Sequence, residues 1–406
     1  MVRSRNWLAS SLLLAWAAAA VAPVAQIPAG TEIQLRLKTK VASNASKAKD
    51  PVEAIVLEPV MVNGAFAIPA GTTVRGVVES AKAAASGDRA QLALNFNQLE
   101  MGSKKVKLAT LLTAVDNARE QINDKGQILG ILSSETISGE LDSEISKVTE
   151  RYSGLGDILG AAKGAFLKPV DTEIVYSPGV ELTVKLTQPV TLNGTAPPGP
   201  VAKLQPVADQ DALVQLVNSQ PFQTVAQKPP KPSDMTNLMF IGSEELLRAA
   251  FADAGWSEAA ALSTQSKLET FRAIAEVRGY KEAPVSVLLL DGQAPSLVFE
   301  KLNNTFAQRH HLRVWRRPVS FEGKAVWVCS ATHDTGIAFS EKDRTFIHKI
   351  DPQIDRERAK VVSDLLLTGK VRSLAAVERP LVPRQSANAT GDQLLTDGQM
   401  AVVILQ

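Results

Sequence analysis

Alternating apolar and polar residues dominate the first half of the chain. Three segments, 27–37, 68–78 and 176–186, each begin with a proline–glycine turn and continue as such a run. In the first, Ile33 and Leu35 alternate with polar neighbours, the period-two pattern of a strand with one buried face. Further strands are predicted at 52–60, 91–99 and 105–111, with Asn63-Gly64 as a hairpin turn. The pattern predicts a small all-β barrel or sandwich over residues 26–192.

A different pattern interrupts this half between residues 116 and 168, where we predict a helical insert with a helix at 139–152. The glycine-rich stretch 154–164 that follows superficially resembles a phosphate-binding loop. It lacks the required Gly-Lys-Ser/Thr, because Lys163 precedes Gly-Ala, and no strand leads into it. The insert is therefore interpreted as a helical excursion.

Prolines and polar residues crowd residues 193–233, which we predict to be an interdomain linker. A short helix is expected within it at 209–218. Because proline favours extended chain, the linker is predicted to be a stiff spacer that keeps the two domains apart.

The second domain is predicted over residues 234–406. An apolar strand at 238–241 leads to an amphipathic helix that begins at the N-cap Ser243 and ends at Gly255. The other expected helices are 263–278 and 354–368, and the other expected strands are 285–290, 296–302, 310–316, 325–331, 346–350 and 400–405. This order predicts an α+β domain with helices packed on a mostly antiparallel sheet.

The N-terminal 25 residues have the pattern of a secretory signal peptide. Arg3 and Arg5 precede an apolar run from Trp7 to Val21, and several alanines before Gln26 offer cleavage points. An uncleaved membrane anchor is the alternative, but the run is shorter than the ~20 residues that cross a bilayer. We therefore expect a periplasmic or secreted protein with no integral membrane segment after removal of the signal.

Composition narrows the set of partners. The formal charge of +2 includes the two arginines of the signal, so the mature chain is neutral and lacks the basic surface expected of a nucleic-acid-binding protein. The single cysteine, Cys329, rules out an intrachain disulfide. The remaining candidate partners are an envelope protein or a small anionic ligand.

Two family resemblances follow from these residues. Ile-Pro-Ala-Gly-Thr occurs at 27–31 and 68–72, and Asp-Pro-Val-Glu-Ala at 50–54 lies between them, so this half resembles the β-barrel domain of TrbI-type conjugation-channel proteins. That resemblance implies a barrel fold and an envelope location. Residues 234–406 resemble the LssY C-terminal domain through ordered phrases at 240–243, 254–256, 283–286, 309–315, 326–328, 331–334, 347–352, 355–358 and 396–398. This second resemblance implies a fold unit and a location, and no reaction.

All four histidines of the chain, His310, His311, His333 and His348, lie on or just after three predicted strands of the second domain. Imidazole beside carboxylate can bind a divalent metal and can also act in general acid-base catalysis. The candidate catalytic residues are His311, His333 and Asp334, and the candidate metal ligands are His333, Asp334, His348 and Asp351. Alternation places His310 on one strand face with Leu312 and Val314; if that face meets the core, His311, Arg313 and Trp315 line a ligand groove on the other face. The candidate ligand-binding residues are Arg309, His310, Arg313 and Trp315.

Each assignment has a structural alternative. His348 shares a strand face with Phe346 and Ile350, which favours a structural role, and Asp351 is placed to cap the following helix. Two function classes remain open. One is an envelope binding or scaffolding protein, and the other is a hydrolase, with or without a metal, that acts on a phosphate- or ester-bearing envelope molecule. The sequence leaves open whether the chain is an enzyme.

Overall fold

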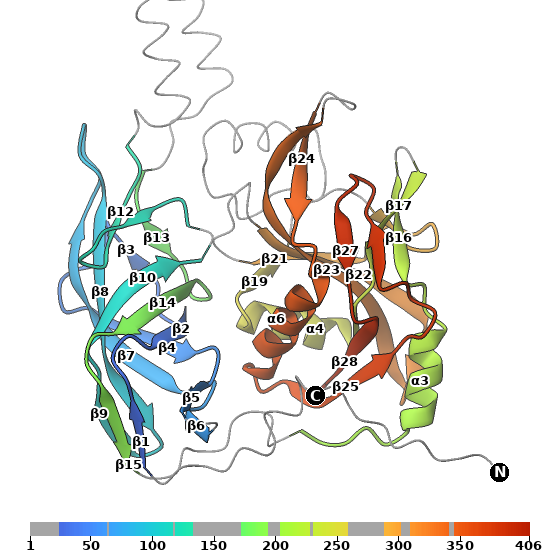
Figure 1. Cartoon of the computed structure of the whole chain (residues 1–406), viewed down its shortest axis with the longest axis horizontal. Coiled ribbons are helices and arrows are strands. Elements are labelled where there is room, and N and C mark those ends of the chain that lie inside the picture. Colours follow the sequence, from blue (N-terminus) through green and yellow to red (C-terminus); the bar gives the residue numbers. More distant parts are fainter. Residues whose placement is uncertain are drawn as a thin grey trace, which may run out of the picture.

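The computed structural model describes residues 24–62, 65–116, 118–132, 172–193, 204–227, 230–258, 288–301, 309–340 and 345–406. Most of the predicted signal peptide, the hairpin turn at 63–64, the predicted helices at 139–152 and 263–278 and the glycine-rich stretch at 154–164 lie outside these residues. Figure 1 shows two halves side by side, the first in blue to green and the second in yellow to red.

The first half is a strongly curved, nearly closed antiparallel sheet, which confirms the predicted barrel (Figure 1). In sheet order its described strands are β10 (Thr110–Val115), β14 (Glu181–Leu186), β2 (Glu32–Leu37), β4 (Pro51–Val56), β7 (Thr73–Lys82), β8 (Gln91–Met101), β12 (Gln127–Leu129) and β11 (Gln121–Ile122), with β9 (Lys104–Lys107) beside β8. Three short antiparallel pairs join it: β1 (Val24–Ile27) with β15 (Val190–Asn193), β3 (Val41–Ala42) with β13 (Val175–Tyr176), and β5 (Val60–Val62) with β6 (Ala65–Ile68).

The alternating pattern explains the barrel interior. Leu35 of β2, Phe96 of β8 and Val184 of β14 belong to one buried core, while their sequence neighbours point outward. The sheet curls back on itself where the Thr110 hydroxyl of the end strand β10 donates to the Phe96 carbonyl oxygen of β8 at 2.7 Å. A sheet that closes on itself in this way leaves few exposed edges.

The second half contains an eight-stranded mixed sheet among its described residues. In order the strands are β19 (Trp256–Glu258), β21 (Leu297–Lys301), β22 (Arg309–Phe321), β23 (Lys324–Ser340), β18 (Leu238–Ile241), β28 (Gln399–Leu405) and β25 (Val371–Glu378), with β24 (Thr345–Ile350) beside β23. Within this sheet β18 and β28 are parallel and the other pairs are antiparallel. The expected α+β domain with a mostly antiparallel sheet is confirmed.

Both faces of this sheet are covered. On one face Phe240 and Leu312 pack with helices α4 (Glu244–Asp253) and α6 (Ile354–Leu366). On the other face Trp315 packs with helix α3 (Gln210–Asn218) and with the small sheet β17 (Pro230–Met235), β16 (Gln223–Gln227) and β20 (Leu288–Leu289). A hairpin of β26 (Gln385–Ala387) and β27 (Gln393–Leu395) completes the described elements. No helix among them is both long and apolar enough to span a bilayer.

The segment predicted as a stiff linker is folded over much of its length. Helix α3 forms where expected, and Asp209 caps it by accepting a hydrogen bond from the Ala212 amide at 2.9 Å. Strands β16 and β17 were not expected, because Pro230 and Pro232 argue against a central strand. Both prolines lie in β17 at the edge of its sheet, where a missing N–H is tolerated.

Candidate functional site

Most of the predicted site residues lie on the long antiparallel pair of β22 and β23. His310 is directly opposite His333, and Arg309 is directly opposite Asp334. Because side chains alternate along a strand, adjacent residues point to opposite faces of the sheet. His310 and His333 therefore face α6, whereas His311 and Asp334 face the other way. The predicted catalytic set of His311, His333 and Asp334 is divided by the sheet.

On the α6 face, His310, His333 and Glu357 form a compact group, which we name the histidine cluster. The two imidazole rings are stacked, with centroids 4.0 Å apart and planes 13° from parallel. His310 Nδ1 lies 2.8 Å from Glu357 Oε2, and its Nε2 lies 3.4 Å from Asp116 Oδ2 at the end of β10. The cluster therefore lies where the barrel meets the second domain.

The two stacked histidines differ in charge. Burial by itself disfavours protonation of His310, but Glu357 and Asp116 outweigh it and raise the pKa of His310 to about 9. Burial, together with the neighbouring positive charge of His310, lowers the pKa of His333. At neutral pH an imidazolium thus stacks on a neutral imidazole. Within the described residues, His333 Nε2 and Glu357 Oε1 are buried without a hydrogen-bond partner.

Glu357 was missed in the sequence analysis as a site residue, although the helix pattern carries a signal for it. Ile354, Glu357 and Val361 follow one another at helical spacing and are all buried. A glutamate at an apolar-stripe position is unusual and calls for a partner. Asp116 carries no such signal, because its proximity to His310 arises only when the two domains meet.

The opposite face holds a second buried group. The Asp334 carboxylate accepts from Arg309 Nη2 at 2.8 Å and lies 2.9 Å from His311 Nε2. Arg313 Nη1 donates to Asp234 Oδ2 at 3.2 Å. Burial lowers the pKa of Arg313, and Asp234 partly offsets that effect. These residues pair with one another and give Asp334 two cationic or hydrogen-bonding neighbours.

The ligand groove expected on this face is not found in the described part of the chain. Trp315 is only 1% exposed, lies in an apolar core and donates from Nε1 to the Gln293 carbonyl oxygen at 3.1 Å. His311 and Arg313 are also buried. The prediction assumed a sheet with one covered face. Here α3 and the β16 sheet cover the second face.

Among the predicted metal ligands whose side chains the structure describes, His333, Asp334 and Asp351, no common site forms either. Asp351 forms a turn just before α6, because its Oδ1 accepts from the Gln353 amide at 2.9 Å, and Gln353 is the N-cap residue of α6. His348 lies on β24 in register with Ile337, three positions along β23 from Asp334. Of the predicted ligands only His333 belongs to the histidine cluster.

Five charged residues join the two domains and are named here the junction network: Arg36 on β2, Glu181 on β14, Lys301 on β21, and Lys360 and Asp364 on α6. Arg36 Nη2 contacts Glu181 Oε1 at 2.8 Å and also pairs with Asp364. Lys301 Nζ lies 2.9 Å from both Glu181 Oε1 and Asp364 Oδ2. Lys360 Nζ lies 2.6 Å from Glu181 Oε2. The expectation that the domains keep apart is therefore wrong.

The network is held tightly. Arg36 and Lys301 are each 1% exposed, and Trp256 Nε1 donates to Asp364 Oδ2 at 2.8 Å. Burial on its own raises the pKa of Glu181, but Lys301, Lys360 and Arg36 hold it well below the ordinary value. Burial also raises the pKa of Asp364, but the positive charges of Arg36, Lys301 and Lys360 outweigh this effect and lower it. Both carboxylates are ionised at neutral pH.

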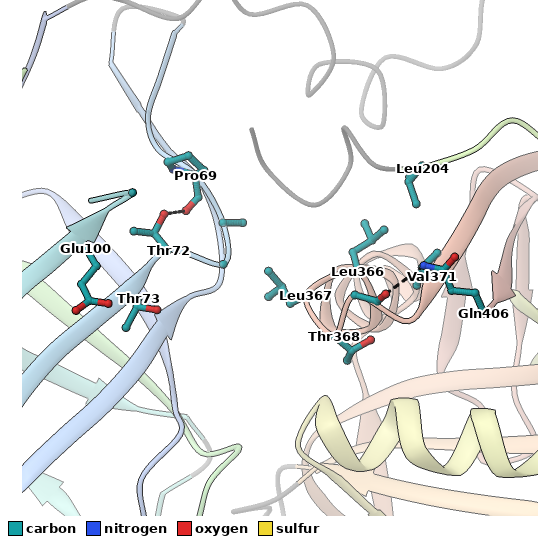
Figure 2. Close-up of a pocket in the computed structure, with 14 residues that line it drawn as sticks. Pro69, Thr72, Thr73, Glu100, Leu204, Leu366, Leu367, Thr368, Val371 and Gln406 are labelled. Carbon is teal, nitrogen blue, oxygen red and sulfur yellow. Dashed lines mark hydrogen bonds between the residues drawn. The ribbon is translucent and has the colours of Figure 1, made fainter. Parts of the chain in front are cut away.

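A cleft of about 450 Å³ lies beside this junction. Figure 2 shows barrel residues on one side and the end of α6 on the other. The barrel wall includes Thr72, Thr73 and Glu100, and the opposite wall includes Leu366, Thr368 and Gln406. The Thr72 hydroxyl donates to the Pro69 carbonyl oxygen at 2.6 Å, which fixes the turn that forms the rim.

Comparison with known proteins identifies the second domain. Its mixed sheet, covered on both faces, defines it as an α+β domain. Residues 218–400 match the family model described as LssY C-terminus, so this domain is an LssY C-terminal domain. The match begins inside the segment predicted as linker and includes β16 and β17. The TrbI-type resemblance of the barrel is not confirmed and stays a prediction. No curated protein matches the chain.

Proposed function

We propose that this protein is an exported binding or scaffolding protein of the cell envelope, and that its two domains act as one rigid unit. The junction network carries the proposal. Export to the periplasm or beyond the envelope rests on the signal-like pattern of the first 25 residues. The interdomain cleft replaces the groove expected within the second domain as the place where a partner binds.

The junction network argues for a fixed domain orientation. Domains that move independently usually meet through polar, hydrated surfaces. Here Arg36 and Glu181 of the barrel are buried against Lys301 and Asp364 of the second domain. Within the joined protein these charges satisfy one another, and a small shift of one domain that broke a pair without admitting water would leave a buried charge uncompensated, at about 3–5 kcal/mol. A fixed orientation is what a binding site shared by two domains requires.

The cleft lining indicates the kind of ligand. Thr72, Thr73, Thr368 and Gln406 offer hydrogen-bonding groups beside leucines, and the described residues that line the cleft include no lysine or arginine. The charged side chain among these lining residues, Glu100, is paired with Arg75 at 2.7 Å. An anionic ligand would meet no counter-charge from this lining. We therefore favour an uncharged segment of an envelope protein, bound through main-chain hydrogen bonds and apolar side chains.

Photo-cross-linking in cells that make the protein tests this proposal. A photoreactive amino acid is placed at Thr73 or Thr368, on the two walls of the cleft, and at Leu381 as a control, because this leucine is 91% exposed in a loop. We expect the same adduct from both cleft positions and none from Leu381. Equal adducts at all three positions, or none at either wall, would contradict the proposal.

A hydrolase is the second candidate, and the histidine cluster is the observation that favours it. Two imidazoles beside a carboxylate match the groups used in acid-base and metal-assisted hydrolysis. Turnover of p-nitrophenyl phosphate and p-nitrophenyl acetate, with and without Zn²⁺ or Mn²⁺, tests this candidate. Activity that is lost in His333→Ala would support it. Equal rates for His333→Ala and the wild type would remove it.

A further inference from the structure

The histidine cluster offers ligands for a metal ion. One ligand atom from each of His310, His333 and Glu357 lies within 4.8 Å of the other two. The three residues come from β22, β23 and α6, so three separate elements converge on one point. Two imidazole nitrogens and a carboxylate oxygen are a donor set typical of Zn²⁺ and related divalent cations.

Two buried atoms of the cluster have no hydrogen-bond partner among the described residues. Glu357 is 3% exposed, and its Oε1 has no hydrogen-bond partner among the described residues. His333 Nε2 is also buried and has no hydrogen-bond partner among the described residues. Buried polar atoms in folded proteins are nearly always satisfied, so an unsatisfied pair in one cluster needs an explanation. A bound cation would satisfy both.

The geometry shows what binding requires. Ligand atoms around a tetrahedral Zn²⁺ lie about 3.3 Å apart, so atoms that lie within 4.8 Å of one another need approach by no more than roughly 1.5 Å. Stacked parallel rings cannot both direct a nitrogen lone pair at one ion, so one imidazole must turn. His333 can turn most easily, because its Nε2 makes no hydrogen bond to the described residues that would have to break.

We propose that His310, His333 and Glu357 bind a divalent cation of the Zn²⁺ type, with water as the remaining ligand and with release of the Nδ1 proton of His310. Asp116 Oδ2 lies 3.4 Å from His310 Nε2, the ring nitrogen on the far side from Glu357, so Asp116 is placed to accept a hydrogen bond from the ligating imidazole and to orient it. A residue of the barrel thereby supports a metal site in the LssY C-terminal domain. This inference is independent of the ligand proposed for the cleft.

Calorimetric titration of the purified, EDTA-treated full chain with ZnCl₂ tests the site. We expect one saturable site per chain and a rise in melting temperature on Zn²⁺ addition. Substitutions His333→Ala and Glu357→Gln should each weaken binding at least tenfold. Asp116→Asn should keep one saturable site with weaker affinity, because it changes the acceptor that orients the His310 ring and leaves all three ligands in place.

His311→Gln is the matched control, since His311 is a buried histidine of the same strand that faces away from the cluster. It should bind Zn²⁺ as the wild type does, and circular dichroism confirms that each variant is folded. Co²⁺ in place of Zn²⁺ should give the visible spectrum of a tetrahedral site. The inference is overturned if no saturable site exists, or if folded His333→Ala and Glu357→Gln bind Zn²⁺ like the wild type. Neither result bears on cross-linking in the cleft.

Discussion

At the scale of single residues, Asp334 and Asp351 show how differently two nearby carboxylates are used. Asp334 is buried and contacts both Arg309 and His311, whereas Asp351 accepts a hydrogen bond from the Gln353 amide in the turn before α6. Removing one partner of a buried ionic group leaves uncompensated charge, while removing the acceptor in a turn costs one hydrogen bond. The two substitutions should therefore differ clearly in their effect on stability.

We predict that Asp334→Asn lowers the free energy of unfolding by about 3–5 kcal/mol. Asp351→Asn, the matched control, should cost about 1 kcal/mol or less, because the asparagine side-chain oxygen can accept the same bond in the turn. Urea unfolding followed by circular dichroism measures both. Equal losses would show that Asp334 is not the centre of a buried ionic group.

Gly255 tests the closeness of the two domains. It has a φ of 79°, and a Cβ at this position would lie 2.7 Å from the Gly179 Cα of the barrel. Gly292 has a φ of 75°, but a Cβ there would meet no atom of the described residues within 4 Å. The two glycines thus share a left-handed backbone conformation and differ in the neighbour that a side chain would meet.

We predict that Gly255→Ala lowers the melting temperature more than Gly292→Ala does. Both alanines are strained by the positive φ, but only Gly255→Ala pushes the barrel loop away. Thermal unfolding of the two variants beside the wild type gives the comparison. If both variants lose a similar amount of melting temperature, the barrel loop at Gly179 moves aside at no measurable cost in stability.

The sequence predicts the region in which the candidate site residues lie better than it predicts which residues contact one another there. All four histidines were expected in one region, and His310 and His333 do lie together. Alternation correctly separated His310 from His311 on β22. The partners could not be foreseen, because Glu357 and Asp116 reach His310 from α6 and from the other domain. Such contacts depend on tertiary packing, which strand periodicity does not encode.

At the scale of elements, caps and periodicity were reliable guides. Strand β18 occupies Leu238–Ile241 as predicted, and α4 begins after Ser243, whose hydroxyl accepts from the Leu246 amide at 3.2 Å. Strand β25 was missed, since Val371–Glu378 directly follows a helix and lacks clean alternation. The parallel pairing of β18 with β28 was also beyond reach, because pairing between distant segments leaves no local signal.

The cap on α4 gives a prediction of its own. Ser243→Ala should lower the free energy of unfolding by about 1 kcal/mol, because the Leu246 amide loses its acceptor at the end of the helix. Ser243→Asp should retain stability, since aspartate also caps and suits the positive helix terminus. Urea unfolding measures both. A loss with aspartate equal to that with alanine would contradict the capping role.

At the scale of the whole molecule, the prolines of residues 193–233 suggested two separate domains. The packed junction arises from residues that look like ordinary surface charges in the sequence. Arg36 lies between Leu35 and Leu37, and this alternation predicts a side chain on the outside of the barrel. Arg36 does lie there, but the second domain covers it. Only the assembled fold shows that this outer face is an interface.

The junction network predicts a dependence of stability on pH. The pKa values of Glu181 and Asp364 are lower in the folded protein than in the unfolded chain, so the unfolded chain binds more protons in acid. Their contribution to stability is present above the unfolded pKa values of about 4 and is lost as pH falls through the folded values.

Urea unfolding at pH 7, 5 and 3 should therefore show a steep loss of stability between pH 5 and 3. In Glu181→Gln this loss should be shallower, because one of the two carboxylates no longer titrates. The substitution Glu32→Gln, at an exposed residue of β2, is the control and should keep the full slope. An unchanged slope in Glu181→Gln would contradict the assigned role.

The central claim is that the junction network holds the two domains in one fixed arrangement. Spin labels at Lys107→Cys on the barrel and Leu381→Cys on the second domain, both exposed, allow pulsed electron–electron distance measurement, and buried Cys329 does not take a label. We predict one narrow distance distribution in the otherwise wild-type chain and a broad one when Asp364→Ala is added. A broad distribution without Asp364→Ala, or a narrow one that this substitution leaves unchanged, would contradict the claim.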